Sequence, residues 1–224
     1  MWTKEEAELL VLNADTNLIA TCNTCDMLFG DISKKKIYWK TKNYEVSRVK
    51  KFGVFGDLNP RVVQALVDHY KEVSLLTFNS ALDLGEGEQT RSLLDTTTIT
   101  NIIHYGVYDV NLQDLKYGEQ SGGRSRGVYA SMLYHNRVRG IQGEREAVES
   151  LIQNLKKEVV VHIDFRVLHA NLGGLTFNEL NYVLEEVGIL RNLVGFSLTS
   201  YAIADPAVVA KIFRKLVGAT LFEG

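Results

Sequence analysis

The sequence predicts an α/β protein, a three-layer α/β/α sandwich with a mainly parallel sheet. Short segments rich in Val, Ile and Leu alternate with amphipathic segments of helix length along most of the chain. The strand-like segments 73–78 and 159–164 are apolar at consecutive positions, as strands buried on both faces are. Alternation of such strands with long helices is typical of βαβ units, whose strands are parallel.

The first predicted unit covers residues 52–78. Residues 52–56 form a strand that ends in a glycine turn, and Asn59 is a typical helix N-cap. Pro60 then occupies the first helical position, and the helix through residue 71 has apolar residues at helical spacing. Residues 73–78 form the next strand.

The remaining elements follow the same rules. Thr176 and Glu179 have the spacing of a capping box, which predicts a helix from there to about residue 187. The other expected elements are strands over 98–107, 159–164 and 193–199 and helices over 144–157 and 206–217.

Composition narrows the classes of protein. The chain has 224 residues, 25 Lys and Arg against 27 Asp and Glu, and a formal net charge of −2. The chain has no excess of basic residues, which a nucleic-acid-binding protein would usually carry. It also has no apolar run of about 18 residues, which a membrane span would need. Two cysteines cannot build a disulfide framework, and the N-terminus opens with acids rather than a signal sequence, so we expect a cytoplasmic protein.

We expect residues 1–224 to form a single domain, in which residues 1–51 are a reduced or divergent N-terminal part. In parallel sheets, ligands bind beyond the carboxyl ends of the strands. The segments to inspect are therefore 56–59, 79–83, 164–169 and 198–201.

Five short motifs at these strand ends resemble motifs of one family, in the same order. Residues 55–59 (FGDLN) resemble Gly-Gly-Asp-His-Ser, and 79–83 (NSALD) resemble Asp-Ala-His-x-Asp. Residues 106–109 (GVYD) resemble Gly-Ile-Arg-Asp, and 162–169 (HIDFRVLH) resemble Ser-Phe-Asp-x-Asp-x-x-Asp. Residues 173–176 repeat Gly-Gly-Leu-Thr. The chain thus resembles the arginase/agmatinase/formimidoylglutamase, or ureohydrolase, family, which implies an arginase-like fold.

The resemblance implies a dinuclear manganese site, but the residues depart from it. Family members use two Mn²⁺ ions to generate a hydroxide that attacks a guanidinium or amidine carbon. The six ligand positions correspond to Leu58, Asn79, Ala81, Asp83, Asp164 and Arg166. Only Asp83 and Asp164 keep the family's residue type. The family's substrate-binding glutamate corresponds to Leu198, and His169 stands where the third motif has its last Asp.

The first hypothesis is therefore a pseudoenzyme or interaction protein that needs no cofactor. It would assemble as a homo-oligomer or with an active relative, and would bind neither nucleic acid nor membrane. The alternative is a divergent hydrolase of linear amidine or guanidino substrates, with Asp83, Asp164 and His169 as its residues and Mn²⁺ as its cofactor. A third reading is a small-molecule sensor that uses the remaining cleft.

Arg166 supports a more specific prediction. Two residues after Asp164 on an extended strand, its side chain would lie on the same face as that carboxylate. Its guanidinium would then replace the charge of the metal, pairing with Asp83, Asp164 or both. Leu58 and Ala81 would fill the former ligand positions as packing.

Other motifs carry weaker hypotheses. Cys22 and Cys25 have redox or zinc spacing but no further ligands nearby, so they are expected to be ordinary thiols. The glycine-rich segment 118–127 is expected to be a mobile surface loop, with anion binding as the alternative. Seven lysines around Trp39 and Tyr44 are interpreted as the solvated edge of a hairpin, with contact to nucleic acid or an anionic surface as the alternative.

Overall fold

The computed structural model describes residues 9–12, 37–40, 50–169 and 173–221. Its centre is an eight-stranded sheet of order β2-β1-β3-β8-β7-β4-β5-β6, in which every strand pairing is parallel. The strands are β1 (Leu9–Leu12), β2 (Ile37–Lys40), β3 (Phe52–Phe55), β4 (Val73–Phe78), β5 (Asn101–Val107), β6 (Ser125–Tyr129), β7 (Glu158–Asp164) and β8 (Asn192–Thr199). The predicted α/β sandwich is confirmed.

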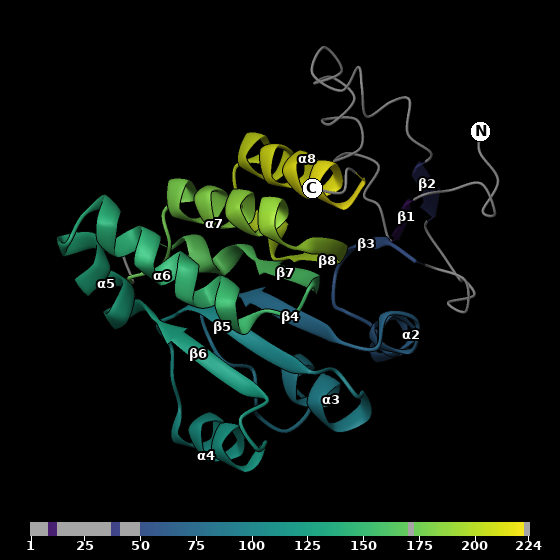
Figure 1. Ribbon diagram of the computed structural model, residues 1–224, viewed down its shortest axis with the longest axis horizontal. Coiled ribbons are helices and arrows are strands. Elements are labelled where there is room, and N and C mark those ends of the chain that lie inside the picture. The colour runs from purple at the N-terminus through teal and green to yellow at the C-terminus, as the bar shows by residue number, and fades with distance from the viewer. Residues whose placement is uncertain (1–8, 13–36, 41–49, 170–172, 222–224) are drawn as a thin grey trace.

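Helices cover both faces of the sheet (Figure 1). One face carries α5 (Ala130–Val138), α6 (Ile141–Asn154), α7 (Phe177–Leu190) and α8 (Pro206–Leu221). The other carries α2 (Pro60–Tyr70), α3 (Gln89–Thr96) and α4 (Leu112–Gln120). Short 3-10 turns η3 (Phe165–Leu168) and η5 (Tyr201–Ile203) follow β7 and β8. Each face therefore has its own apolar core, and burial of these cores holds the three layers together.

Capping residues in the sequence correctly predicted where two helices begin. The Asn59 side chain accepts a hydrogen bond from the Arg61 amide, and Pro60 is the first residue of α2, as predicted. Thr176 and Glu179 form the predicted capping box at the start of α7. In addition, the Glu179 carboxylate binds the Arg137 guanidinium, which ties α5 to the beginning of α7.

Four elements between residues 89 and 138 were not predicted: α3, α4, β6 and α5. The segment 118–127 is not a mobile surface loop, because it contains the end of α4, a turn and the start of β6. The strand expected over 98–107 begins only at Asn101. Helix α4 has one buried residue, Asp114, and α5 also has one, Leu133, so neither helix shows the apolar stripe that sequence patterns detect.

Two glycines make room for large side chains on the neighbouring strand. Phe52 of β3 pairs with Gly195 of β8, and Gly53 pairs with Phe196. A Cβ atom on either glycine would overlap the ring of its partner. Phe52 packs in the core under α2 and Phe196 in the core under α5 to α8, so each face of the sheet has one such pair.

The chain order creates a switch point between β4 and β7. From β4 the chain continues to β5 through α3, on one face of the sheet, whereas from β7 it continues to β8 through α7, on the other face. The two connections therefore diverge from a pair of adjacent strands, which is where open α/β sheets bind ligands.

Candidate functional site

A polar cleft of about 410 Å³ lies at the carboxyl ends of the strands next to this switch point. Its walls come from the segments that follow β3, β4, β7 and β8 and from the start of α3. The lining residues are Asp57, Leu58, Pro60, Asp83, Gly87, Glu88, Gln89, Ser92, His162, Asp164, Arg166, Thr199 and Ser200. We call this the strand-end cleft. All four segments expected to hold a site, 56–59, 79–83, 164–169 and 198–201, contribute lining residues.

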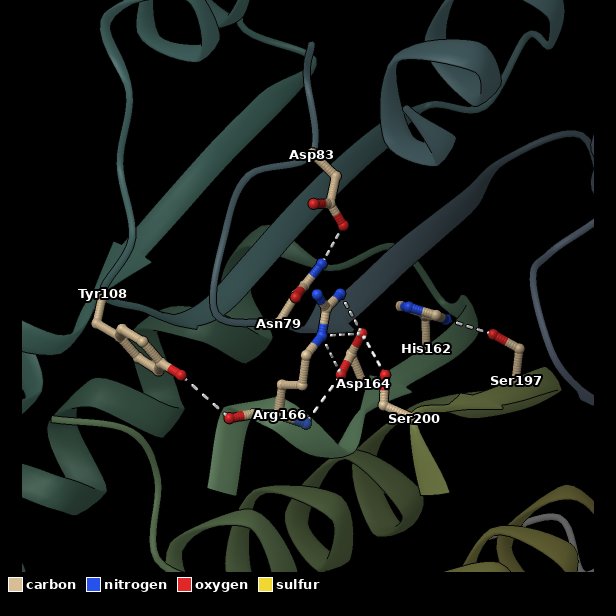
Figure 2. Close-up of polar contacts among 8 residues, drawn as sticks. All are labelled: Asn79, Asp83, Tyr108, His162, Asp164, Arg166, Ser197 and Ser200. Atoms are coloured by element: carbon tan, nitrogen blue, oxygen red, sulfur yellow. Dashed lines mark hydrogen bonds and ion pairs between the residues drawn. The ribbon is translucent and has the colours of Figure 1, made fainter. Parts of the chain in front are cut away.

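An ion pair between Asp164 and Arg166 forms one wall of the strand-end cleft (Figure 2). The Arg166 Nε donates to both carboxylate oxygens at 3.0 Å, and Nη2 donates to Oδ2 at 2.7 Å. The Arg166 amide and the Ser200 hydroxyl donate to the same carboxylate. Burial alone would raise the pKa of Asp164, but these hydrogen bonds, Arg166 foremost, hold it below its ordinary value.

The predicted pairing of Arg166 with Asp164 is confirmed, but the geometric reason given for it is wrong. Strand β7 ends at Asp164, and Arg166 lies in the 3-10 turn η3 rather than on an extended strand. Asp164 caps this turn by accepting the Arg166 amide, which brings the guanidinium back over its own cap residue. The Asp164 side chain is only 4% exposed, whereas that of Arg166 is 55% exposed.

Asp83 occupies the opposite wall and is held in a strained backbone conformation. Its φ of 50° lies in the left-handed region, which costs energy for a residue with a Cβ. Leu82 and Leu84 on either side are buried, and the Asn79 side chain donates a hydrogen bond to the Asp83 carboxylate. Burial and then the neighbouring Glu88 raise the pKa of Asp83 to about 6, against the opposing effects of Asn79 and Arg166.

His162 is a residue of the strand-end cleft that sequence reasoning did not assign. It is 4% exposed, and its Nδ1 shares a hydrogen bond with the buried Ser197 hydroxyl on β8 (Figure 2). Burial lowers the pKa of His162 to about 4, although Asp164 and Asp57 act in the opposite direction, so the ring is neutral at pH 7. The sequence signal was its position two residues before Asp164, which places both side chains on the same face of β7.

The other candidate residues differ in whether they line the strand-end cleft. Leu58 is buried in the core under α2 and also lines the strand-end cleft, so the prediction that it serves as packing is confirmed. Ala81 is half-buried, forms a backbone bridge with Asp109 and does not line the cleft. His169 is exposed at the end of η3 and does not line it either.

The chemistry of these positions does not fit a dinuclear manganese site. Leu58 and Ala81 have no donor atom, and Arg166 places a permanent positive charge against Asp164. Of the two carboxylates among the six positions, Asp164 is paired with Arg166, and Asp83 makes no ion pair within the described residues. Within the described ranges, no group of three or more His, Cys, Asp or Glu side chains could hold a metal ion.

Two sequence hypotheses fall outside these observations. Cys22 and Cys25, and most of the lysine cluster, lie outside the described residues. Lys40, Lys50 and Lys51 of that cluster are described. Lys40 ends β2, which pairs in parallel with β1, so these two strands do not form the expected hairpin. No helix in the described residues has the length and apolar character needed to cross a membrane.

The fold is that of solved ureohydrolase structures. Among solved structures, a formiminoglutamase from Trypanosoma cruzi, crystallised with Mn²⁺, is similar over 100% of this chain and 96% of its own, with a TM-score of 0.74 and 14% identity. A formimidoylglutamase from Bacillus subtilis matches over 99% and 90%, with a TM-score of 0.70 and 12% identity. An arginase from Bacillus cereus matches over 96% and 98%, with a TM-score of 0.67 and 11% identity.

At these identities the likeness concerns the fold. No family profile matches the sequence, and a search of curated proteins finds no relative. The arginase-like fold expected from the five motifs is nevertheless confirmed.

Proposed function

We propose that this protein has lost dinuclear-manganese hydrolysis of guanidino and amidine C–N bonds and works as a pseudoenzyme through binding. The observation that carries the proposal is the two-point ion pair of Arg166 with Asp164. A guanidinium cannot be deprotonated at physiological pH, so it competes permanently with any cation for this carboxylate. The apolar Leu58 and Ala81 remove two further donors from the ligand set that the resemblance implies.

The direct test is the metal content of the purified protein. After incubation with Mn²⁺ and removal of free metal, we expect far less than one bound ion per chain by inductively coupled plasma mass spectrometry. A pair of tightly bound Mn²⁺ ions per chain would overturn the proposal. The same samples, assayed with formimidoylglutamate, agmatine and arginine, should release no product.

A divergent hydrolase is the second candidate, and one observation favours it. The pKa of about 6 places Asp83 in the range in which a carboxylate can exchange protons near neutral pH. Asp83 also keeps an unusual backbone conformation in the strand-end cleft, as functional residues often do. Hydrolysis of an amidine or guanidino substrate that is abolished by Asp83→Asn and kept by Asp109→Asn would establish this candidate instead.

Assembly is part of the first proposal. We propose that the chain forms a homo-oligomer or joins an active relative, since the fold is shared with proteins of that family. Light scattering coupled to size-exclusion chromatography measures the mass in solution. A monomer at micromolar concentration would contradict self-assembly.

A further inference from the structure

The strand-end cleft presents polar groups that the described residues leave without partners. The clearest is His162, because an imidazole that is 96% buried normally uses both of its nitrogens. Its Nδ1 is bound to Ser197, whereas its Nε2 has no hydrogen-bond partner within the described residues, and His162 lines the cleft. Figure 2 shows the ring beside the Arg166–Asp164 pair.

The partner of Nδ1 determines which proton this ring carries. Ser197 is completely buried, and His162 is its only side-chain hydrogen-bond partner in the described chain. Because the Ser197 hydroxyl has no other side-chain acceptor in the described chain, it donates its proton to Nδ1. The proton of the neutral ring is then on Nε2. His162 therefore offers an N–H donor to the strand-end cleft.

A second donor lies on the same wall. The pair with Asp164 uses Nε and Nη2 of Arg166, so Nη1 remains without a partner among the described residues. More than half of the Arg166 side chain is exposed, and Arg166 lines the cleft. Together, Arg166 and His162 form a donor wall that suits an oxyanion.

The facing groups have the opposite character. Asp83 uses one carboxylate oxygen for Asn79, and the other has no hydrogen-bond partner in the described residues. Glu88 and Asp57 line the same cleft, are exposed, and make no ion pair with any described residue. The charge of Glu88 contributes to the raised pKa of Asp83, so the two carboxylates lie near each other and a cation between them would relieve their repulsion.

We propose that the strand-end cleft binds a small zwitterion, with its carboxylate on Arg166 and His162 and its ammonium group on Asp83 and Glu88. The inference rests on the proposed function in one respect, the absence of a metal pair from the cleft. A ligand with only one charge satisfies only one wall, and the volume of about 410 Å³ admits a molecule that spans both. The ligand is held without being cleaved.

The experiment is a thermal-shift and calorimetric titration of the metal-free full chain with glycine, β-alanine and γ-aminobutyrate. The three zwitterions increase the separation of the charges step by step, and methylammonium and acetate supply each charge alone. We expect at least one zwitterion to raise the melting temperature, because a ligand that binds only the folded state stabilises it. The single ions should have much smaller effects.

Variants assign the two walls. Glu88→Gln and Arg166→Gln change exposed side chains and should each weaken binding of the zwitterion by about tenfold, the loss of one charged hydrogen bond. His162→Gln should also weaken it, but this variant alters a buried residue, so the two exposed variants decide the assignment. Glu86→Gln, an exposed change in the same loop outside the cleft lining, should leave binding unchanged.

Three results would overturn the proposal. Equal protection by methylammonium would make the cleft a cation site, and equal protection by acetate would make it an anion site. No protection by any of the three zwitterions would remove the ligand class altogether. Bound Mn²⁺ in the same preparation is measured separately, so failure of the proposed function is distinguished from failure of the zwitterion.

Discussion

The guanidinium of Arg166 binds the carboxylate of Asp164, two residues earlier in the chain, with Nη2 and Oδ2 2.7 Å apart. The contact depends on the turn η3, because Asp164 caps that turn through the Arg166 amide and so brings both ends of the pair together. A buried carboxylate at the end of the central strand β7 thus carries its own counter-ion.

Removing this counter-ion should weaken the fold. Arg166→Ala takes three hydrogen bonds from Asp164, which keeps the Arg166 backbone amide and Ser200 as partners. We expect the free energy of unfolding to fall by about 1–2 kcal/mol, less than for a fully buried pair, because water reaches the arginine. Urea denaturation at pH 7 measures it.

A matched control is Arg145→Ala, which breaks an exposed ion pair with Glu149 on α6. That change should leave the free energy of unfolding nearly unchanged, because an ion pair between exposed side chains adds little stability. The difference between the two variants should shrink as the pH falls, because a depressed pKa of Asp164 stabilises the fold only while the carboxylate is ionised. Equal costs for both variants at pH 7 would contradict the importance of the Arg166–Asp164 pair.

Replacing the arginine by an acid should open the strand-end cleft to metal. Arg166→Asp restores the residue type that the family resemblance places there and leaves Asp83 and Asp164 without a fixed cation. We expect weak Mn²⁺ binding by isothermal titration calorimetry, limited because Leu58 and Ala81 still provide no ligands. Arg145→Asp serves as the control for added charge. If Arg166→Asp binds no more Mn²⁺ than this control, the arginine is not what excludes the metal.

Asp83 should make the fold less stable as the pH rises. Its pKa is raised from 3.8 to about 6, so between these values the folded state binds more protons than the unfolded state, and stability falls with increasing pH. Asp83→Asn removes this ionisation. It should raise the free energy of unfolding at pH 8 by about 2–3 kcal/mol, since one pKa unit is worth about 1.4 kcal/mol, and change little near pH 4.

The measurement is a series of urea titrations between pH 4 and pH 8 on wild type and variant. Asp109→Asn, at an exposed position, is the control and should show no such trend. A stability difference between Asp83→Asn and wild type that stays constant over this range would show that Asp83 titrates normally.

The glycine and phenylalanine pairs between β3 and β8 should not tolerate a methyl group. In Gly195→Ala the new Cβ overlaps the Phe52 ring, which belongs to the core under α2 and cannot move freely. We expect a loss of about 1–3 kcal/mol, the usual cost of overpacking. Gly218→Ala in α8 has open space at its Cβ and should instead stabilise by up to about 1 kcal/mol. Similar melting temperatures for the two variants would refute this account.

Most of the architecture could be predicted from local patterns. The strands β4, β7 and β8 are rich in apolar residues and buried at nearly every position, because helices cover both faces of the sheet. The starts of α2 and α7 could be predicted from the capping residues Asn59 and Thr176. The elements from α3 to α5 could not be predicted in this way. Helix α4, for example, buries only Asp114, so nothing in its apolar pattern distinguishes it from a surface loop.

The candidate site, too, could be predicted from the sequence only in part. Sequence by itself determined that Leu58 and Ala81 cannot bind metal and that Arg166 carries a positive charge beside Asp164, because these are properties of residue types. Only the tertiary structure decided which groups share the strand-end cleft. His162 became a cleft residue because Ser197 on the adjacent strand holds its Nδ1, and Asp83 faces Asn79 because two buried leucines fix its turn. Such contacts depend on strand register and burial, which residues far apart in the sequence set together.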